Sequence, residues 1–289
     1  MTPSKKTIRT GVMGWPVAHS RSPLLHGYWL KQHAINGEYT ALAVPPGDFT
    51  KTFSQLPEQG FSGVNITVPH KQAALEAITL AGGAVTEMAR YIGAVNAVVF
   101  HANGPVEGDN TDAFGFMENL REKAPQWKGD NPVAVLGAGG AARAVCAGLA
   151  GAGVKEIRIV NRTEEKAQNL ARMFGPSIIP VSWEDRETSL ADVSLLVNGT
   201  PLGMAGSPLL DLALARLPAA AVVYDIVYAP LETPLLGAAK ARGNPVVDGL
   251  GMLIHQARPA FEAWFGVLPE ATSELREMLE ADLRKGETT

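Results

Sequence analysis

Short apolar runs alternate with amphipathic segments along the first third of the chain. The runs predict strands at 7–13, 38–44 and 63–68, and the segments between them predict helices at 23–32, 49–59 and from Pro69 onward. Residues 91–100 predict a pair of strands or a loop that leads into a strand. Strands that alternate with helices form mostly parallel sheets, so this region is expected to be an α/β domain with such a sheet.

The alternation starts again, more regularly, after a polar stretch. A charged helix at 118–131 is followed by predicted strands at 132–136, 156–160, 192–197, 222–227 and 245–247, with helices at 141–150 and 163–174. A helical tail from Leu250 to Lys285 comes after the last strand. With 289 residues, the chain is long enough for two domains of about 150 residues.

Composition and charge remove several classes of protein. The net charge is −4, from 25 basic and 29 acidic residues, which gives no reason to expect a nucleic acid as partner. The single cysteine, Cys146, lies in a small apolar run and predicts a packed core residue in a protein that needs no disulfide. No apolar stretch has the length of a membrane span, and no histidine cluster has the spacing of a zinc site. A cytoplasmic protein without membrane contact and without a metal is therefore expected.

A glycine-rich turn follows the strand at 132–136. Gly137, Ala138, Gly139, Gly140, Ala141 and Ala142 match the pattern GxGxxG/A between a strand and a helix of small residues. In this context the first glycine makes a tight turn, and the second lets the backbone approach a pyrophosphate at the positive end of the helix. The pattern predicts a dinucleotide site in a Rossmann-type domain.

The end of the next strand distinguishes between the two nicotinamide dinucleotides. An NAD site usually has an acidic residue there, which accepts hydrogen bonds from the ribose 2′-hydroxyl. This chain has Asn161, Arg162 and Thr163, with Lys166 one turn later. The planar guanidinium of Arg162 suits a 2′-phosphate, so NADP is the expected cofactor.

Polar residues at the ends of predicted elements in the first region are candidates for substrate binding and proton transfer. Lys71 follows the run Asn65–Pro69, and Asn96 and Asp112 come at the ends of other elements. An isolated lysine is usually a solvated surface charge. Lys71 is a candidate only because the other polar residues also lie at the ends of predicted elements.

Seven motifs, in order along nearly the whole chain, carry a resemblance to a known family. They lie at 19–23, 65–71, 93–96, 110–112, 137–142, 161–163 and 251–257. Together they resemble the shikimate dehydrogenases. The resemblance implies reversible NADPH-dependent reduction of 3-dehydroshikimate to shikimate, in the biosynthesis of chorismate and the aromatic amino acids.

The resemblance also implies roles for individual residues. Lys71 and Asp112 are expected to be catalytic. The residues expected to bind the substrate are Ser20, Ser22, Thr67, Lys71, Asn96, Asp112, Tyr228 and Gln256. Those expected to bind NADP are Gly137, Ala138, Gly139, Gly140, Ala141, Asn161, Arg162, Thr163, Lys166, Thr200, Ile226, Gly249 and Met252.

These expectations give a domain plan and leave two other functions open. Residues 1–110 and 249–289 form the expected α/β substrate domain, because the last helices return to it, and 111–248 form the NADP-binding Rossmann domain. The chain is expected to be a monomer or a homodimer. One alternative is a quinate/shikimate dehydrogenase with broader use of substrates and cofactors. The other is a nucleotide-sensing module that binds NADP without turnover, because a fold alone does not fix a function.

Overall fold

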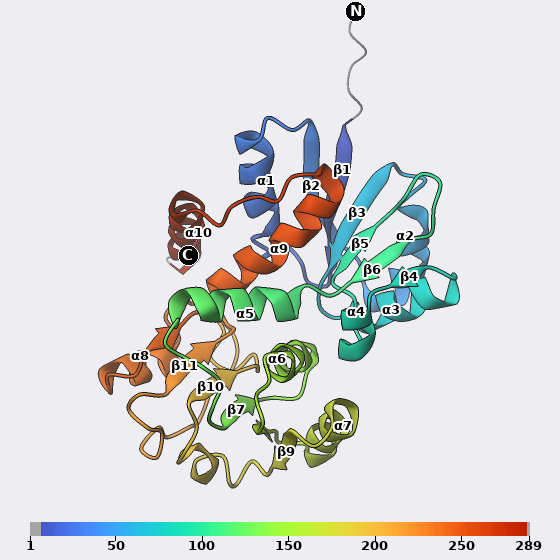
Figure 1. Ribbon diagram of the computed structural model, residues 1–289. Helices are drawn as coiled ribbons and strands as arrows, with labels where there is room; N and C mark the ends of the chain where they lie inside the picture. The colour runs from blue at the N-terminus through green and yellow to red at the C-terminus, as the bar shows by residue number, and fades with distance from the viewer. Residues whose placement is uncertain (1–6, 288–289) are drawn as a thin grey trace, which may run out of the picture. The chain divides into compact units, whose positions relative to one another are not determined.

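The computed structural model describes residues 7–287, and these form two compact units (Figure 1). The first unit contains the described chain up to Thr111 together with Gln256–Leu279, and the second contains Asp112–His255 and the described residues from Glu280 onward. Each unit has one six-stranded sheet with helices packed on it. The chain is therefore an α/β protein, as its pattern predicts.

The sheet of the first unit mixes parallel and antiparallel strands in the order β2-β1-β3-β5-β6-β4. The strands are β1 (Ile8–Gly14), β2 (Gly37–Ala43), β3 (Phe61–Ile66), β4 (Ala84–Val85), β5 (Ala97–Val99) and β6 (Glu107–Asp109). The pairs β1–β2, β1–β3 and β4–β6 are parallel, whereas β5 runs antiparallel to both β3 and β6. Only residues 100–106 join β5 to β6, too few for the crossover that a parallel pair needs.

The helices of the first unit begin where the chain leaves its strands. They are α1 (Ser22–Gln32), α2 (Phe49–Gln55), α3 (Lys71–Leu80) and α4 (Glu87–Ile92). The prediction that Pro69 opens a helix is wrong. The His70 N–H donates to the Thr67 carbonyl at 2.9 Å in a tight turn that contains Pro69, so α3 begins only at Lys71.

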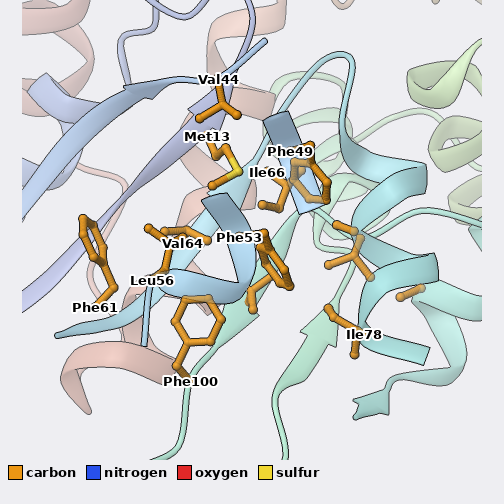
Figure 2. Packing of buried hydrophobic residues seen from close by; sticks show 14 of the residues in the cluster. Met13, Val44, Phe49, Phe53, Leu56, Phe61, Val64, Ile66, Ile78 and Phe100 are labelled. Carbon is orange, nitrogen blue, oxygen red and sulfur yellow. The ribbon is translucent and has the colours of Figure 1, made fainter. Parts of the chain in front are cut away.

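An aromatic cluster forms much of the core under α2 and α3 (Figure 2). Phe49 stacks on Phe53 with 5.4 Å between ring centroids, and Phe53 lies 5.6 Å from Phe100. Met13 and Ile66, from β1 and β3, are fully buried in the same cluster. Aromatic side chains bury large apolar areas, so this cluster holds α2 firmly on the sheet.

The second unit has an all-parallel sheet in the order β12-β11-β10-β7-β8-β9. Its strands are β7 (Val133–Leu136), β8 (Ile157–Val160), β9 (Ile178–Val181), β10 (Leu195–Asn198), β11 (Val222–Asp225) and β12 (Val246–Val247). Counted within the unit, this is the order of a Rossmann fold, whose dinucleotide lies where the strand order reverses. That point is between β7 and β10, so the Rossmann prediction is confirmed.

Helices α5 (Asp112–Lys123), α6 (Gly140–Gly151), α7 (Glu164–Phe174) and α8 (Pro234–Ala241) belong to the second unit. The predicted helix at 118–131 is wrong in its bounds, because α5 begins at Asp112 and ends at Lys123. Helix α9 (Gly249–Phe265) starts in the second unit and ends in the first, and α10 (Ser273–Glu287) follows it. Cys146 lies on α6 with no exposed surface, and burial raises the pKa of its thiol to about 12.

Membrane-spanning helices and metal-binding clusters can be assessed for residues 7–287. None of the helices there combines the length and the apolar character needed to cross a bilayer. Nor do those residues bring three His, Cys, Asp or Glu side chains together in a way that could hold a metal ion.

Candidate active site

Lys71 is held in place by the residues on either side of its helix start. His70, buried just before it, has its Nε2 atom 2.7 Å from the Val44 carbonyl and stacks on Phe49 at 4.8 Å. The Lys71 carbonyl accepts the Val95 N–H at 2.9 Å. The backbone of Lys71 is thus fixed by the core, while its side chain remains partly exposed at the carboxyl end of β3.

Thr67 follows β3 and continues its pairing with β1. Its N–H donates to the Met13 carbonyl at 2.9 Å, and the Trp15 N–H donates to the Val68 carbonyl at 3.0 Å. A Cβ atom on Gly14 would lie 2.3 Å from Thr67 Cγ2. Only glycine at position 14 lets Thr67 take this place at the edge of the sheet.

Asn96 is the centre of a buried polar network in the first unit. It is 2% exposed, and its Oδ1 atom accepts the Thr111 N–H at 2.8 Å and the Thr111 hydroxyl at 3.2 Å. Its Nδ2 donates to Thr111 Oγ1 at 3.1 Å and to Gln256 Oε1 at 3.3 Å. The Thr111 hydroxyl also lies 2.8 Å from the Gln256 carbonyl. Two of the residues expected to bind the substrate, Asn96 and Gln256, therefore meet, although 160 positions separate them in sequence.

A second set of buried groups extends this network toward α1. The Asn65 amide donates to the Asn96 carbonyl at 3.0 Å, and the Tyr39 hydroxyl donates to Asn65 Oδ1 at 2.7 Å. Burial raises the pKa of Tyr39, against a smaller opposite effect of a hydrogen bond with Ser22. His26 stacks on the Tyr39 ring at 4.0 Å, and burial lowers the pKa of His26 to about 3, so this imidazole is neutral.

Ser20 and Ser22 lie at the start of α1. The Ser22 N–H is 3.3 Å from Ser20 Oγ, which ties the two serines into one turn, and Pro23 occupies the first turn of the helix. Ser22 is buried and Ser20 is partly exposed. The first unit thus presents hydroxyl and amide groups at the ends of β3, β5 and α1.

Asp112 and Tyr228 belong to the second unit. Asp112 is the first residue of α5, is 6% exposed and comes directly after Thr111 in the chain. Tyr228 lies three residues beyond the end of β11 and is partly buried.

The turn after β7 has the shape that a bound pyrophosphate requires. Gly137 has φ +98°, and a Cβ atom there would lie 2.9 Å from Thr200 Cγ2. A Cβ on Gly139 or Gly140 would meet no atom within 4 Å, so both face open space at the start of α6. The Arg143 Nε, in the same turn of α6, is buried without a hydrogen-bond partner. Open backbone and an unmatched cation at a helix N-terminus suit an anion, so these residues fit the cofactor.

The residues expected to select NADP stand together on the surface beyond β8. Arg162, Thr163 and Lys166 are exposed at the start of α7. The Asn161 amide donates to the Thr163 carbonyl at 2.8 Å and so closes the turn that carries Arg162. This surface can bind a phosphate group through a guanidinium, a hydroxyl and an ammonium.

Ile226 and Gly249 are neighbours at the carboxyl edge of the same sheet. A Cβ on Gly249 would lie 2.1 Å from the Ile226 carbonyl oxygen, so the two backbones touch only because position 249 is glycine. One turn into α9, Met252 is 9% exposed. Thr200 begins the loop after β10, where its hydroxyl donates to Asn198 Oδ1 at 2.7 Å.

Three buried polar residues of the second unit were not among the expected site residues. Asn119 donates to the Tyr224 hydroxyl at 2.7 Å and to the Asp248 carbonyl at 2.8 Å, next to Gly249. Asn198 and Asp225 end β10 and β11 and hydrogen-bond to each other. A sequence signal existed for Asn119, because it is a polar residue on the apolar face of an amphipathic helix.

Profiles of three protein families match this chain. They are described as shikimate dehydrogenase substrate binding domain over residues 12–98, shikimate / quinate 5-dehydrogenase over 119–203, and shikimate 5′-dehydrogenase C-terminal domain over 249–272. Shikimate dehydrogenase (NADP(+)) of Paramagnetospirillum magneticum is 54% identical over 274 residues, which cover 94% of this chain and 98% of that protein.

Two solved structures are similar over almost the full length. Shikimate 5-dehydrogenase of Thermus thermophilus in complex with NADP(H) and shikimate is 37% identical, with a TM-score of 0.81 over 96% of this chain and 99% of that one. Quinate dehydrogenase of Corynebacterium glutamicum in complex with NAD is 33% identical, with a TM-score of 0.87 over 95% of this chain and 99% of that one.

Proposed function

Because the chain belongs to the shikimate dehydrogenase family, we propose that Lys71 and Asp112 are the catalytic pair of its reaction. The protein is an NADP-dependent oxidoreductase that acts on a CH–OH group. It catalyses the reversible NADPH-dependent reduction of 3-dehydroshikimate to shikimate in aromatic amino-acid biosynthesis.

In the proposed mechanism, Lys71 handles the proton that accompanies hydride transfer. NADPH, when bound, would supply the hydride that reduces the carbonyl carbon. As that carbon is reduced, the Lys71 ammonium gives a proton to the carbonyl oxygen, and in the oxidation direction the neutral amine takes the proton back. Asp112 orients the lysine and the hydroxyl. The buried anchor at His70 supports this role, because it fixes the backbone from which Lys71 extends.

The hydroxyl and amide groups of the first unit are proposed to hold the substrate. Ser20 and Ser22 bind its carboxylate together with Tyr228, and Thr67, Asn96, Asp112 and Gln256 bind its ring hydroxyls. The observation that carries this assignment is the Asn96–Thr111–Gln256 network, which brings Asn96, directly before β5, and Gln256 of α9 together in fixed orientations. Fixed donors and acceptors recognise one arrangement of ring hydroxyls better than others.

The second unit is proposed to bind NADP, and the first unit the substrate. Gly137–Ala141 hold the pyrophosphate, and Asn161, Arg162, Thr163 and Lys166 hold the 2′-phosphate. Thr200, Ile226, Gly249 and Met252 line the place of the nicotinamide. The order of strands supports this assignment, because a dinucleotide spans the reversal point between β7 and β10.

One direct experiment tests the activity. Purified protein is mixed with shikimate and NADP⁺, and NADPH formation is followed by absorbance from neutral to alkaline pH. Turnover is expected, and its absence at every pH would contradict the proposal. Parallel assays with quinate and NAD⁺ measure the breadth of the reaction. The comparisons do not favour the broader quinate/shikimate activity, and the exposed Arg162 and Thr163 support a preference for NADP.

Two expectations remain predictions about the protein in the cell. We expect it to work in the cytoplasm, since its one cysteine is buried and offers no disulfide. A monomer or a homodimer is expected, and light scattering of the purified protein distinguishes the two.

A further inference from the structure

Two loops leave the carboxyl edge of the second unit's sheet on the side away from β8. The loop after β10 contains Thr200, and the loop after β11 contains Ile226 and ends at Thr233, the N-cap of α8. Because Arg162 follows β8 on the other side of the reversal point, the adenosine end of the dinucleotide belongs there. The nicotinamide end then belongs to the β10 and β11 loops.

A single buried carboxylate joins these two loops. Asp225 Oδ1 accepts the Asn198 amide at 3.0 Å and the Val227 N–H at 3.0 Å, and its Oδ2 accepts the Thr233 hydroxyl at 2.7 Å. Asp225 and Asn198 have no exposed surface, and Thr233 is 1% exposed. One bond reaches Asn198, the last residue of β10, and the other two fix both ends of the β11 loop.

Asn198 connects Asp225 to the loop after β10, which contains Thr200. Its Oδ1 accepts the Thr200 N–H at 3.1 Å and the Thr200 hydroxyl at 2.7 Å, and its Nδ2 also donates to the Leu202 carbonyl at 3.1 Å. Asp225 and the Leu202 carbonyl both accept hydrogens of the Asn198 amide, and together they determine that its oxygen faces Thr200. Without the carboxylate, the Asn198 amide loses one of these two acceptors, the one that ties it to β11.

Asp225 places a buried carboxylate at a sheet edge that hydrophobic contacts alone could pack. Within the part of the chain that the structure describes, Asp225 has no basic partner, and its interactions are the three donors just named. Burying a carboxylate without a cation costs free energy, which hydrogen bonds only partly return. A buried carboxylate without a cation is expected where the positions of the neighbouring groups matter more for function than the stability of the fold does.

We propose that Asp225 is a positioning residue that couples the β10 and β11 loops and thereby sets the nicotinamide-binding geometry of Thr200 and Ile226. This inference rests on the proposed function, because it assumes that a nicotinamide dinucleotide binds at this edge. It assigns no contact between Asp225 and the cofactor itself.

The test separates the two ends of the cofactor. NADPH carries the nicotinamide, whereas adenosine 2′,5′-bisphosphate carries only the adenosine end, and the dissociation constants of both are measured by titration. The Asp225→Ala variant is expected to weaken NADPH binding about tenfold, the effect of losing roughly one net hydrogen bond's free energy. Binding of the bisphosphate is expected to stay within about twofold of wild type, because the Arg162 side is untouched. Asp225→Asn should recover most of the loss, since its carbonyl oxygen keeps two of the three acceptor bonds.

Asn244 provides a matched control. It is 4% exposed and lies at the amino ends of the strands, opposite to the carboxyl edge that carries Asp225. Its amide donates to the carbonyls of Pro218, Ala219 and Ala221 at 2.8, 3.1 and 2.9 Å. Asn244→Ala and Asp225→Ala are both expected to lower the melting temperature, but Asn244→Ala is expected to leave the dissociation constant of NADPH at the wild-type value.

Several results would overturn the proposal. One is an Asp225→Ala variant that binds NADPH as wild type does, another is equal weakening of NADPH and the bisphosphate, and a third is weaker NADPH binding in Asn244→Ala. If Asp225→Ala does not fold, Thr233→Val removes one donor to Asp225 together with the acceptor of the Leu236 N–H at the start of α8, and unchanged NADPH binding in that variant also overturns the proposal. If the wild type binds NADPH but does not oxidise shikimate, the proposed function fails, while these binding measurements still decide the role of Asp225.

Discussion

The backbone N–H of Thr111 donates to Asn96 Oδ1 over 2.8 Å, and this bond fixes the direction in which the Asn96 amide faces. Replacing Asn96 by alanine leaves that buried N–H without a partner, which costs about 1–3 kcal/mol of folding stability. It also removes the donor to Gln256, so the KM for shikimate is expected to rise at least about tenfold. Urea unfolding and steady-state kinetics measure the two effects.

The matched variant is Thr111→Val, which keeps the backbone N–H but loses the hydroxyl. Its KM for shikimate is expected to lie between those of the wild type and Asn96→Ala. An unchanged KM in Asn96→Ala would show that the network does not hold the substrate.

Lys71→Ala is expected to lower kcat strongly while shikimate still binds. Loss of a general acid or base typically costs about 10²–10⁴-fold in rate. Stopped-flow turnover and equilibrium titration with shikimate separate rate from affinity. Lys51, an exposed lysine on α2 of the same unit, is the control, and its alanine variant should behave as wild type. Loss of shikimate binding in Lys71→Ala would instead make Lys71 a substrate anchor.

Two neighbouring glycines are expected to respond differently to alanine. Gly137→Ala forces a side chain into φ +98° and against Thr200, so the free energy of unfolding should fall by about 1–3 kcal/mol. Gly139→Ala meets no atom within 4 Å, so stability should change by less than about 0.5 kcal/mol. NADPH binding should nevertheless weaken, because the added methyl occupies the phosphate approach. Tight NADPH binding in Gly139→Ala would refute the placement of the pyrophosphate.

Arg162→Ala is expected to raise the KM for NADP⁺ about tenfold or more and to leave the KM for NAD⁺ unchanged, because only NADP⁺ carries a 2′-phosphate. Arg172→Ala, on the exposed face of α7, which follows Arg162, is the control. Equal changes of the KM for NADP⁺ and for NAD⁺ would mean that Arg162 does not bind the 2′-phosphate.

Asp225 also makes stability depend on pH. Burial raises the pKa of this carboxyl from 3.8 to about 6, against the opposing effect of its hydrogen bonds with Thr233, Val227 and Asn198. Because the folded-state pKa lies above the unfolded one, the protonated Asp225 contributes to the free energy of unfolding below pH 3.8, and this contribution is lost as pH rises through about 6. Above that pH the free energy of unfolding is lower by about 3 kcal/mol.

Asp225→Asn should lack this dependence. The difference in unfolding free energy between the wild type and the variant is measured by urea titration from pH 4 to 7. It is expected to shift in favour of the variant as pH rises, and a constant difference would contradict the raised pKa.

Much of the fold could be predicted because buried parallel strands are short, β-branched runs. The strands β7 and β8 follow this pattern, and the glycine turn after β7 marks the start of α6. The two-residue strand β4 and the polar strand β6 could not be predicted, because neither has an apolar pattern of its own. Strand β4 forms by pairing with β6, and β6 forms by pairing with β5 and β4. The direction of β5 could not be predicted either. It follows from the short connection to β6, and that connection can be recognised only after β6 is located in the structure.

Candidate site residues can be named from sequence where function requires particular residue types. Lys71, Arg162 and the glycine turn belong to motifs, so they are predictions from sequence alone. Tyr39 and Asp225 could not be found in this way, because their importance lies in which buried groups they meet across the sheet. Those partners are 26 and 27 positions distant in the chain.

The buried thiol on α6 has a practical consequence for studies of this protein. With a pKa of about 12, Cys146 holds almost no thiolate at neutral pH, and the thiolate is the nucleophile that attacks alkylating reagents. The folded protein should therefore remain unlabelled by maleimide dyes. A cysteine introduced at an exposed site in each unit would then accept a fluorophore with little background, so that energy transfer between two dyes can follow the molecule during turnover.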